Sequence, residues 1–294
     1  MAHVVRTPSA PFPIADASVW VHQIPDAHDN LVWLLEDTDA RTAAVVDGPG
    51  ARAVEAFAEA RGLTVTTILN THTHPDHIGI NLAYQRLGRL DEMTVYGART
   101  RADEIPGCTH PVGEGDAFTF AGVPVRVMEA PGHIDGHISF VVDGAVFCGD
   151  TMFAGGCGYL FDGPASLMRE SLSRLAALPP ETRVCCAHEY TQDNLRFAWM
   201  VEPEHPPLAA RIRDVWSRRA EGACVVPSTI GMERETNPFL RWSSPTLRAE
   251  VSRRMALDAD ADDEAIFAAT RALKDRGEHK AAGDDPLPLT EPRP

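Results

Sequence analysis

Directly after a β-branched run that predicts a strand, the sequence reads Thr71-His72-Thr73-His74-Pro75-Asp76-His77. Imidazole and carboxylate groups are common ligands of divalent transition metals, and this stretch offers four of them. Side chains alternate along extended backbone, so His72 and His74 project to the same side and can reach one ion. Asp76 and His77 follow as the chain turns into a predicted helix, where they can face a second ion. The stretch therefore predicts a metal site at the end of a strand.

Three further residues of ligand type follow apolar runs elsewhere in the chain. Each comes just past the end of a predicted strand: His133 after a strand ending near Glu129, Asp150 after 145–148, and His188 after 184–186. Active sites of α/β proteins gather at the carboxyl ends of strands, so we expect these side chains to lie near the histidine-rich stretch. His137, four residues after His133, is interpreted as a neighbour of the site rather than a ligand.

The seven candidate ligands are enough to bind two divalent metal ions. They divide into one set of His72, His74 and His133, a second set of Asp76, His77 and His188, and a bridging Asp150. An aspartate suits the bridge because one carboxylate can offer an oxygen to each ion. Ligand sets that are rich in nitrogen and free of sulfur suit Zn²⁺, and they also admit Fe or Mn.

The pattern before residue 188 predicts an α/β fold. An apolar strand over 43–46, a helix over 51–61 and a strand over 63–69 form a βαβ unit, which implies a parallel pair. Short strands follow between 123 and 148, and two of them are joined by Asp143-Gly144, a favoured hairpin turn. A mixture of βαβ and hairpin elements favours two sheets over a single doubly wound sheet.

The pattern after residue 188 predicts helices with no strands between them, over 195–200, 208–219, 245–255 and 263–274. We therefore expect four parts: an N-terminal extension (1–16), a catalytic domain (17–188), a smaller helical domain (189–276) and a tail (277–294). The tail contains four prolines and few apolar residues, which predicts disorder.

The composition excludes several classes of protein. The 294 residues include 27 Lys and Arg against 42 Asp and Glu, and the net charge of −15 argues against nucleic acid as a partner. No apolar run is long enough to cross a membrane. The N-terminus lacks the apolar segment of a signal peptide, and the six cysteines show no CxxC spacing. These features predict a cytoplasmic protein with reduced thiols, and we expect it to be a monomer.

Further motifs accompany the histidine-rich stretch. They are Pro131-Gly132-His133-Ile134-Asp135-Gly136-His137, Phe147-Cys148-Gly149-Asp150-Thr151, Gly156-Cys157-Gly158, Phe161-Asp162-Gly163, His188-Glu189-Tyr190-Thr191 and Asn237-Pro238-Phe239. With them, the sequence from about Val21 to Lys274 resembles the metallo-β-lactamase superfamily and, within it, the glyoxalase II (hydroxyacylglutathione hydrolase) family. The later motifs are much more specific than the histidine-rich stretch, which the whole superfamily shares.

The resemblance implies an αββα sandwich with two metals at one edge and a C-terminal helical domain closing over the substrate. It also implies hydrolysis of S-(2-hydroxyacyl)glutathione thioesters, typically S-D-lactoylglutathione to D-lactate and glutathione, a step of methylglyoxal detoxification. This chemistry suits two metals, which can lower the pKa of a bridging water to about 7. A thiolate leaves with little acid assistance, since its pKa is about 8.5. Asp76 is assigned as a ligand that could also orient the hydroxide.

The resemblance also implies a set of substrate-binding residues. The family uses basic residues against the carboxylates of glutathione, and Arg271 and Lys274, at i and i+3, share one helix face. Tyr190 is placed to hydrogen-bond the glutathione backbone. Tyr159 stands where the family commonly has Lys or Arg, and Phe161 stands where Tyr is frequent. We therefore expect a glutathione pocket with one cation and one hydroxyl fewer than is usual.

Two alternatives remain open. The first is another enzyme of the superfamily: either a further thioester hydrolase, or a persulfide dioxygenase with one iron on His72 or His74, His133 and Asp150. A mononuclear oxygenase would not need His77 and His188 as ligands. The second is a metal-binding relative without turnover, which would be expected to lack one or more ligands, whereas all seven are present.

Overall fold

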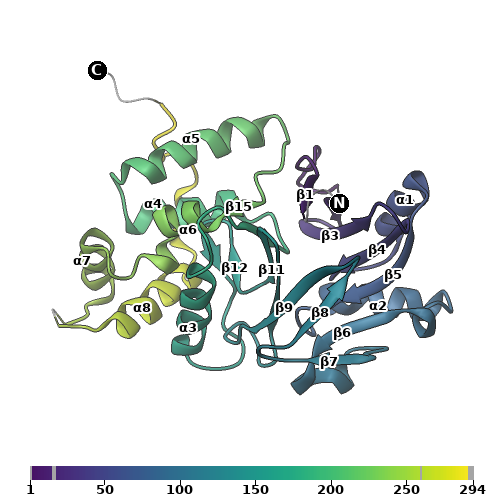
Figure 1. Ribbon diagram of the computed structural model, residues 1–294. Helices are drawn as coiled ribbons and strands as arrows, with labels where there is room; N and C mark the ends of the chain where they lie inside the picture. The colour runs from purple at the N-terminus through teal and green to yellow at the C-terminus, as the bar shows by residue number, and fades with distance from the viewer. Residues whose placement is uncertain (1, 15–17, 259, 291–294) are drawn as a thin grey trace.

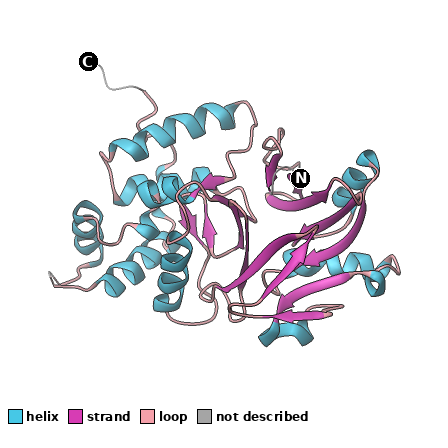
Figure 2. Ribbon diagram, viewed as in Figure 1, coloured by secondary structure: helices cyan, strands magenta, loops and turns pink. Residues whose placement is uncertain are grey.

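The computed structural model describes residues 2–14, 18–258 and 260–290, in which two β-sheets face each other with helices outside (Figures 1 and 2). The first sheet pairs, in order, β1 (Phe12–Ile14), β2 (Val19–Asp26), β3 (Asn30–Asp37), β4 (Thr42–Val46), β5 (Thr64–Leu69), β6 (Thr94–Ala98) and β7 (His110–Val112). The second pairs β15 (Ser228–Thr229), β14 (Arg183–Cys186), β11 (Ala145–Gly149), β10 (Ile138–Val142), β9 (Val123–Glu129) and β8 (Ala117–Phe120). The expected αββα sandwich is confirmed.

Strand β3 shows why the first sheet is covered on both faces. Leu31, Trp33 and Leu35 belong to the apolar core between the sheets, whereas Val32 and Leu34 pack into a second core. Successive side chains of a strand point to opposite faces, so a run that is apolar at every position must be buried on both sides. The second core lies beneath α1 (Arg52–Arg61) and α2 (Pro75–Arg86), on the right of Figure 1.

The elements expected before residue 188 are present. Strands β4 and β5 pair in parallel across α1, as the βαβ pattern predicts. Strands β10 and β11 pair antiparallel around Asp143-Gly144. Helix α3 (Ala165–Ala176) packs beside the second sheet, and β12 (Met152–Phe153) and β13 (Gly156–Cys157) form a small hairpin. The structure also contains short 3₁₀ helices at Leu90–Glu92, Arg99–Glu104 and Pro238–Leu240.

The chain after residue 188 is mainly helical and lies on the left of Figure 1. Its helices are α4 (Thr191–Val201), α5 (Pro206–Ala220), α6 (Ile230–Thr236), α7 (Pro245–Met255), α8 (Asp263–Asp275) and α9 (Glu278–Ala282). The expectation of no strands between these helices is wrong at β15, which pairs antiparallel with β14. Two residues are too few to give a periodic signal, so only the pairing defines this strand. Among the described residues, no helix has the length and apolar character needed to cross a membrane.

The prediction of a disordered tail is wrong for residues 277–290. These residues form α9 and then pack on α4 and α5, where Asp284 accepts hydrogen bonds from Arg196 Nε at 2.6 Å and Trp216 Nε1 at 2.8 Å. Leu287 packs against the apolar cluster of those helices. Composition does not predict this ordered segment, because it is held by a few polar contacts rather than by a pattern of apolar residues. Residues 291–294 lie outside the described part of the chain.

The N-terminal extension is likewise part of the fold over residues 2–14. Strand β1 extends the first sheet, and Thr7 N donates to Gly222 O at 3.1 Å, which joins the N-terminal segment to the helical region. Val5 is buried in the core between the sheets. Residues 2–14 therefore pack as part of the catalytic domain, although the sequence pattern sets them apart from it.

Candidate metal centre

The direction of the strands brings the candidate ligands together. Strands β9 and β11 both pair antiparallel with β10, and β14 pairs in parallel with β11, so these three strands run the same way. His133, Asp150 and His188 follow their carboxyl ends and lie at one edge of the second sheet. The stretch 71–77 follows β5 of the facing sheet and continues into α2, where Pro75 is the first helical residue.

The first ligand set is His72, His74, His133 and Asp150, whose ligand atoms all lie within 4.8 Å of one another. His74 Nδ1 lies 3.1 Å from His72 Nε2 and 3.0 Å from His133 Nε2. Ligand nitrogens at about 2.0 Å from a tetrahedral ion are a little more than 3 Å apart, so this spacing fits one small divalent cation. Asp150 Oδ2 lies 3.5 Å from His133 Nε2.

The second ligand set is Asp76, His77 and His188, with ligand atoms also within 4.8 Å of one another. Asp76 Oδ2 lies 3.3 Å from His188 Nε2 and 3.7 Å from His77 Nε2. Asp150 Oδ1 lies 3.5 Å from His77 Nε2 and 3.6 Å from His188 Nε2. Asp150 therefore turns one oxygen to each set, the arrangement required of a bridging ligand.

Two buried atoms of the centre indicate that the ligand sets suit cations. His77 Nε2 and Asp150 Oδ1 are buried, and neither makes a hydrogen bond within the described residues. Buried polar atoms without partners are rare in folded proteins because their desolvation is uncompensated. A divalent cation between the two atoms would satisfy both, so the donor set fits a dinuclear metal site.

Polar contacts on the far side of the imidazoles fix their orientation. His133 Nδ1 donates to Tyr159 O at 2.7 Å, which leaves Nε2 with its lone pair facing the site. His77 Nδ1 lies 3.0 Å from Asp47 Oδ2, and His188 Nδ1 lies 2.9 Å from Asp29 Oδ1. Such partners orient a metal-binding imidazole and raise its basicity as a ligand.

Three residues of the site are not predicted by the sequence pattern: Asp47, Asp29 and Asn30. Asn30 Nδ2 donates to Asp76 Oδ2 at 3.0 Å, and Asp47 also accepts from Thr71 N at 2.8 Å. For Asp47 a signal existed, since it directly follows β4 just as the histidine-rich stretch follows the parallel β5. For Asp29 and Asn30 no local signal existed, because their place is set by pairing between Asn30 and His188.

The pKa values of the imidazoles are shifted in opposite directions in the two ligand sets. Burial lowers the pKa of all three imidazoles of the first set, which keeps them neutral and able to bind a cation. Burial would also lower the pKa of His77, but the carboxylates of Asp150 and Asp47 outweigh it and raise that pKa well above its usual value. Burial is likewise outweighed at His188, where Asp150 and Asp29 raise the pKa to about 9. The second set is thus a strongly cation-favouring environment.

Two glycines allow the ligand loops to approach closely. At Gly149, with a φ of +47°, a Cβ atom would lie 2.3 Å from Thr71 Oγ1. At Gly158 it would lie 2.1 Å from Asp150 O and 2.8 Å from His133 Nδ1. Any side chain at these positions would displace a ligand-bearing segment.

His137 is buried, and its Nε2 accepts from Asp150 N at 3.2 Å, in agreement with its interpretation as a neighbour of the site.

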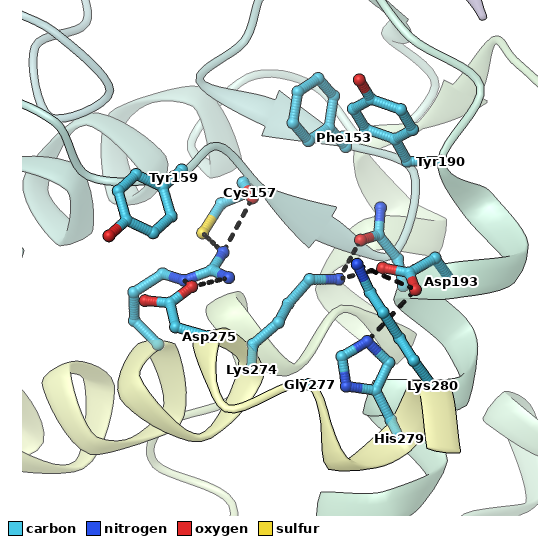
Figure 3. A pocket seen from close by; sticks show the side chains of 12 residues that line it. Phe153, Cys157, Tyr159, Tyr190, Asp193, Lys274, Asp275, Gly277, His279 and Lys280 are labelled. Atoms are coloured by element: carbon cyan, nitrogen blue, oxygen red, sulfur yellow. Dashed lines mark hydrogen bonds and ion pairs between the residues drawn. The ribbon is translucent and has the colours of Figure 1, made fainter. Parts of the chain in front are cut away.

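A cavity of about 610 Å³ lies between the hairpin of β12 and β13 and the helices α4, α8 and α9 (Figure 3). It is lined by Phe153, Cys157, Tyr159, Tyr190, Asp193, Asn194, Arg271, Lys274, Asp275, Gly277, His279 and Lys280. Tyr190 connects it to the metal centre, since its ring stacks on that of His188 with centroids 4.8 Å apart. Four of the five residues predicted to bind substrate thus line one cavity.

Phe161 is the fifth of those residues, and it lies nearer to the metal ligands. Its ring is 59 % exposed and packs edge-on against His74 at 5.2 Å and His133 at 5.3 Å. Tyr159, which is 50 % exposed, packs against Phe161 with ring centroids 4.8 Å apart. The two rings form an apolar rim next to the first ligand set.

The two predicted cations differ in their surroundings. Arg271 is buried, and its Nη1 donates to Cys157 O at 3.1 Å and Gly158 O at 3.4 Å, while Nη2 pairs with Asp275 Oδ1 at 2.6 Å. Lys274 Nζ donates to Asn194 Oδ1 and lies 3.4 Å from Asp193 Oδ2 (Figure 3). Arg271 therefore holds the loop that carries Tyr159, whereas Lys274 places its ammonium at the cavity.

Two facing sheets with seven candidate ligands at one edge are typical of a metallohydrolase of the metallo-β-lactamase superfamily, and the model of that superfamily matches residues 26–188. The model "Hydroxyacylglutathione hydrolase C-terminus" matches residues 189–277. The chain belongs to the hydroxyacylglutathione hydrolase family. It is 44% identical over 256 residues to the hydroxyacylglutathione hydrolase of Synechococcus sp. (strain JA-3-3Ab), which covers 86% of this chain and 98% of the relative.

A second relative agrees with this assignment, and a solved structure shares the fold. The hydroxyacylglutathione hydrolase of Gloeobacter violaceus is 46% identical over 258 residues, which covers 87% of this chain and 99% of the relative. The crystal structure of ETHE1 from Myxococcus xanthus superposes with a TM-score of 0.54 at 24% identity, over 91% of this chain and 98% of that chain. The latter likeness concerns the fold.

Proposed function

We propose that this chain hydrolyses S-(2-hydroxyacyl)glutathione thioesters, such as S-D-lactoylglutathione, at a dinuclear metal site. The observation that carries the proposal is that two groups of candidate metal ligands lie beside a cavity that also presents lysine side chains. Bound divalent cations would supply a nucleophilic water at neutral pH and would polarise the thioester carbonyl. The ligand sets lack sulfur, so we propose Zn²⁺ as the resident ion, with Fe or Mn as alternatives.

The proposed roles of the residues follow from their contacts. The Asp76 side chain is 41% exposed, and Asn30 fixes it through Oδ2, so its carboxylate can orient the attacking water. Burial and the nearby carboxylates raise the pKa of Tyr190, so its hydroxyl stays protonated and can donate to the substrate. The thiolate leaving group needs no dedicated general acid, since its pKa is about 8.5.

The substrate-binding residues are proposed on the same grounds. Tyr190 and Lys274 would contact the glutathione part, Tyr159 and Phe161 would form the rim beside the acyl group, and Arg271 would hold the rim loop in place.

We place the boundary between the catalytic and helical domains between residues 188 and 189. We also propose that the protein acts as a monomer in the cytoplasm; all six of its cysteines are described and unpaired, as in reducing compartments.

The proposed function is tested by following loss of the thioester bond of S-D-lactoylglutathione while the metal content is measured. We expect turnover with about two metal ions per chain. About one iron per chain, with oxygen uptake on glutathione persulfide and no thioester turnover, would instead establish the dioxygenase. The second group of candidate ligands supports the hydrolase, because the mononuclear alternative has no use for it.

Lys274 provides a prediction on pH. Burial lowers the pKa of its ammonium to about 8, against the opposing effect of Asp193, so the side chain loses its charge as the pH rises through that value. Arg271 and Lys280 also face this group. If Lys274 binds a substrate carboxylate, KM should rise about threefold or more between pH 7 and pH 9. In the Lys274→Arg variant, which cannot titrate there, KM should stay level; a parallel rise in both proteins would contradict the role.

A further inference from the structure

Lysine is almost absent from this chain. The sequence contains 25 arginines but only two lysines, Lys274 and Lys280, and both line the cavity beside the metal centre. An ammonium is a compact charge with three donors on a flexible stem, which a planar guanidinium does not replace. In a chain that otherwise uses arginine, we therefore expect the two lysines to lie where a compact, flexible ammonium group is required.

The cavity has a surplus of positive charge. Its charged lining residues are Asp193, Asp275, Arg271, Lys274 and Lys280, so one cation is left over when histidine is neutral. Arg271 is neutralised by Asp275, and its Nη1 hydrogens are used by backbone carbonyls. Its charge is therefore committed to the protein rather than offered to a ligand.

Lys274 and Lys280 are left to share one carboxylate. Lys274 Nζ lies 3.4 Å from Asp193 Oδ2, and Lys280 Nζ lies 3.9 Å from Asp193 Oδ1, so both ammonium groups reach the same place (Figure 3). His279 Nε2 also lies 3.2 Å from Asp193 Oδ1. The Asp193 carboxylate cannot fully compensate two ammonium groups, and an additional anion would be stabilised there.

Lys280 is the more available of the two. Its side chain is 67% exposed, against 9% for Lys274, and its contact with Asp193 is at the outer limit of an ion pair. It lies on α9, which follows the sharp turn at Gly277 and brings the residue back over the cavity. An exposed, weakly paired lysine that faces a cavity can turn to a ligand at little cost.

We propose that Lys280 binds a carboxylate of the glutathione part of the substrate and thereby sets the preference for glutathione thioesters. This inference rests on the proposed function. Glutathione carries two carboxylates and one ammonium, so its thioester is an anion that matches the surplus charge of the cavity. The segment that supplies this cation is the part of the chain after residue 276, which composition alone marks as a tail.

The test compares Lys280→Ala and Lys280→Arg with the unmodified protein on two substrates. On S-D-lactoylglutathione, Lys280→Ala should raise KM about three- to tenfold with kcat and metal content unchanged, and Lys280→Arg should restore part of the loss. On S-D-lactoyl-N-acetylcysteamine, which has no carboxylate, Lys280→Ala should leave kcat/KM unchanged. An equal loss on both substrates, or no loss on either, would overturn the proposal.

Arg253→Ala is a matched control, because it also removes one exposed positive charge but lies on α7 and pairs with Glu250. Its KM for S-D-lactoylglutathione should stay at the unmodified value. If the unmodified protein does not hydrolyse the thioester, the proposed function fails, and glutathione itself is then titrated into both proteins by calorimetry. Weaker binding to Lys280→Ala would support the carboxylate site, whereas equal binding or no binding to either protein would refute it.

Discussion

Replacing Asp150 by Ala should lower kcat/KM for the thioester by about 10³-fold or more and reduce the metal content from two ions to about one or fewer. Asp150 turns Oδ2 to the first ligand set and Oδ1 to the second, at 3.5 Å from His133 and His77 respectively. Its loss removes a ligand from both ions at once. It also removes the carboxylate oxygen that lies beside both His77 Nε2 and His188 Nε2.

Two further variants show how much of the loss in Asp150→Ala comes from its place between the two ligand sets. Asp162→Ala removes an exposed carboxylate of the neighbouring loop that is not a ligand, so activity should stay within about twofold. Asp29→Ala removes the partner of His188 Nδ1, and a loss of about ten- to a hundredfold in activity or metal affinity is expected. If Asp150→Ala kept two metal ions and activity within tenfold of the unmodified protein, the bridging role would be wrong.

That the candidate ligands lie together could be predicted from the sequence, because the physical basis of this arrangement is local. Each candidate ligand follows a strand end by no more than eight residues, as with Asp150 directly after β11, and strands that run the same way end at one edge. The βαβ unit and the hairpin at Asp143-Gly144 are local in the same sense. The assignment of the helical domain to substrate binding needed the family resemblance, since no local pattern joins Lys274 to the metal centre.

What the sequence could not supply depends on contacts between distant segments. Asp29 reaches His188, 159 positions away, only because Asn30 at the start of β3 pairs with His188 just beyond β14. Arg271 and Lys274 share one helix face, as their spacing predicts, but Asp275 and the carbonyl of Cys157 decide that the guanidinium is used internally. Composition cannot weigh such polar contacts, which is also why residues 277–290 were expected to be disordered.

Replacing Glu233 by Leu should lower the free energy of unfolding by about 3–5 kcal/mol. Glu233 is fully buried on α6, and its Oε1 pairs with Arg211 Nη2 at 2.5 Å. Its Oε2 accepts from Gly155 N at 2.8 Å and from Asn237 Nδ2 at 3.0 Å. The carboxylate thus joins the helical domain to the loop between β12 and β13, next to the cavity. Without it, the buried guanidinium and the Gly155 amide lose their acceptor.

A double variant separates the ion pair from general loss of packing. In Arg211→Met with Glu233→Leu, no buried charge is left without a partner, so the double variant should be more stable than Glu233→Leu alone, by about 1–3 kcal/mol in urea denaturation. Glu250→Ala, which breaks contacts with Arg253 and Arg254 on the surface of α7, should cost about 1 kcal/mol or less. If the uncompensated Arg211 charge destabilises Glu233→Leu, its removal should restore part of the free energy of unfolding. A double variant no more stable than Glu233→Leu would show instead that the loss arises from packing and from the Gly155 amide.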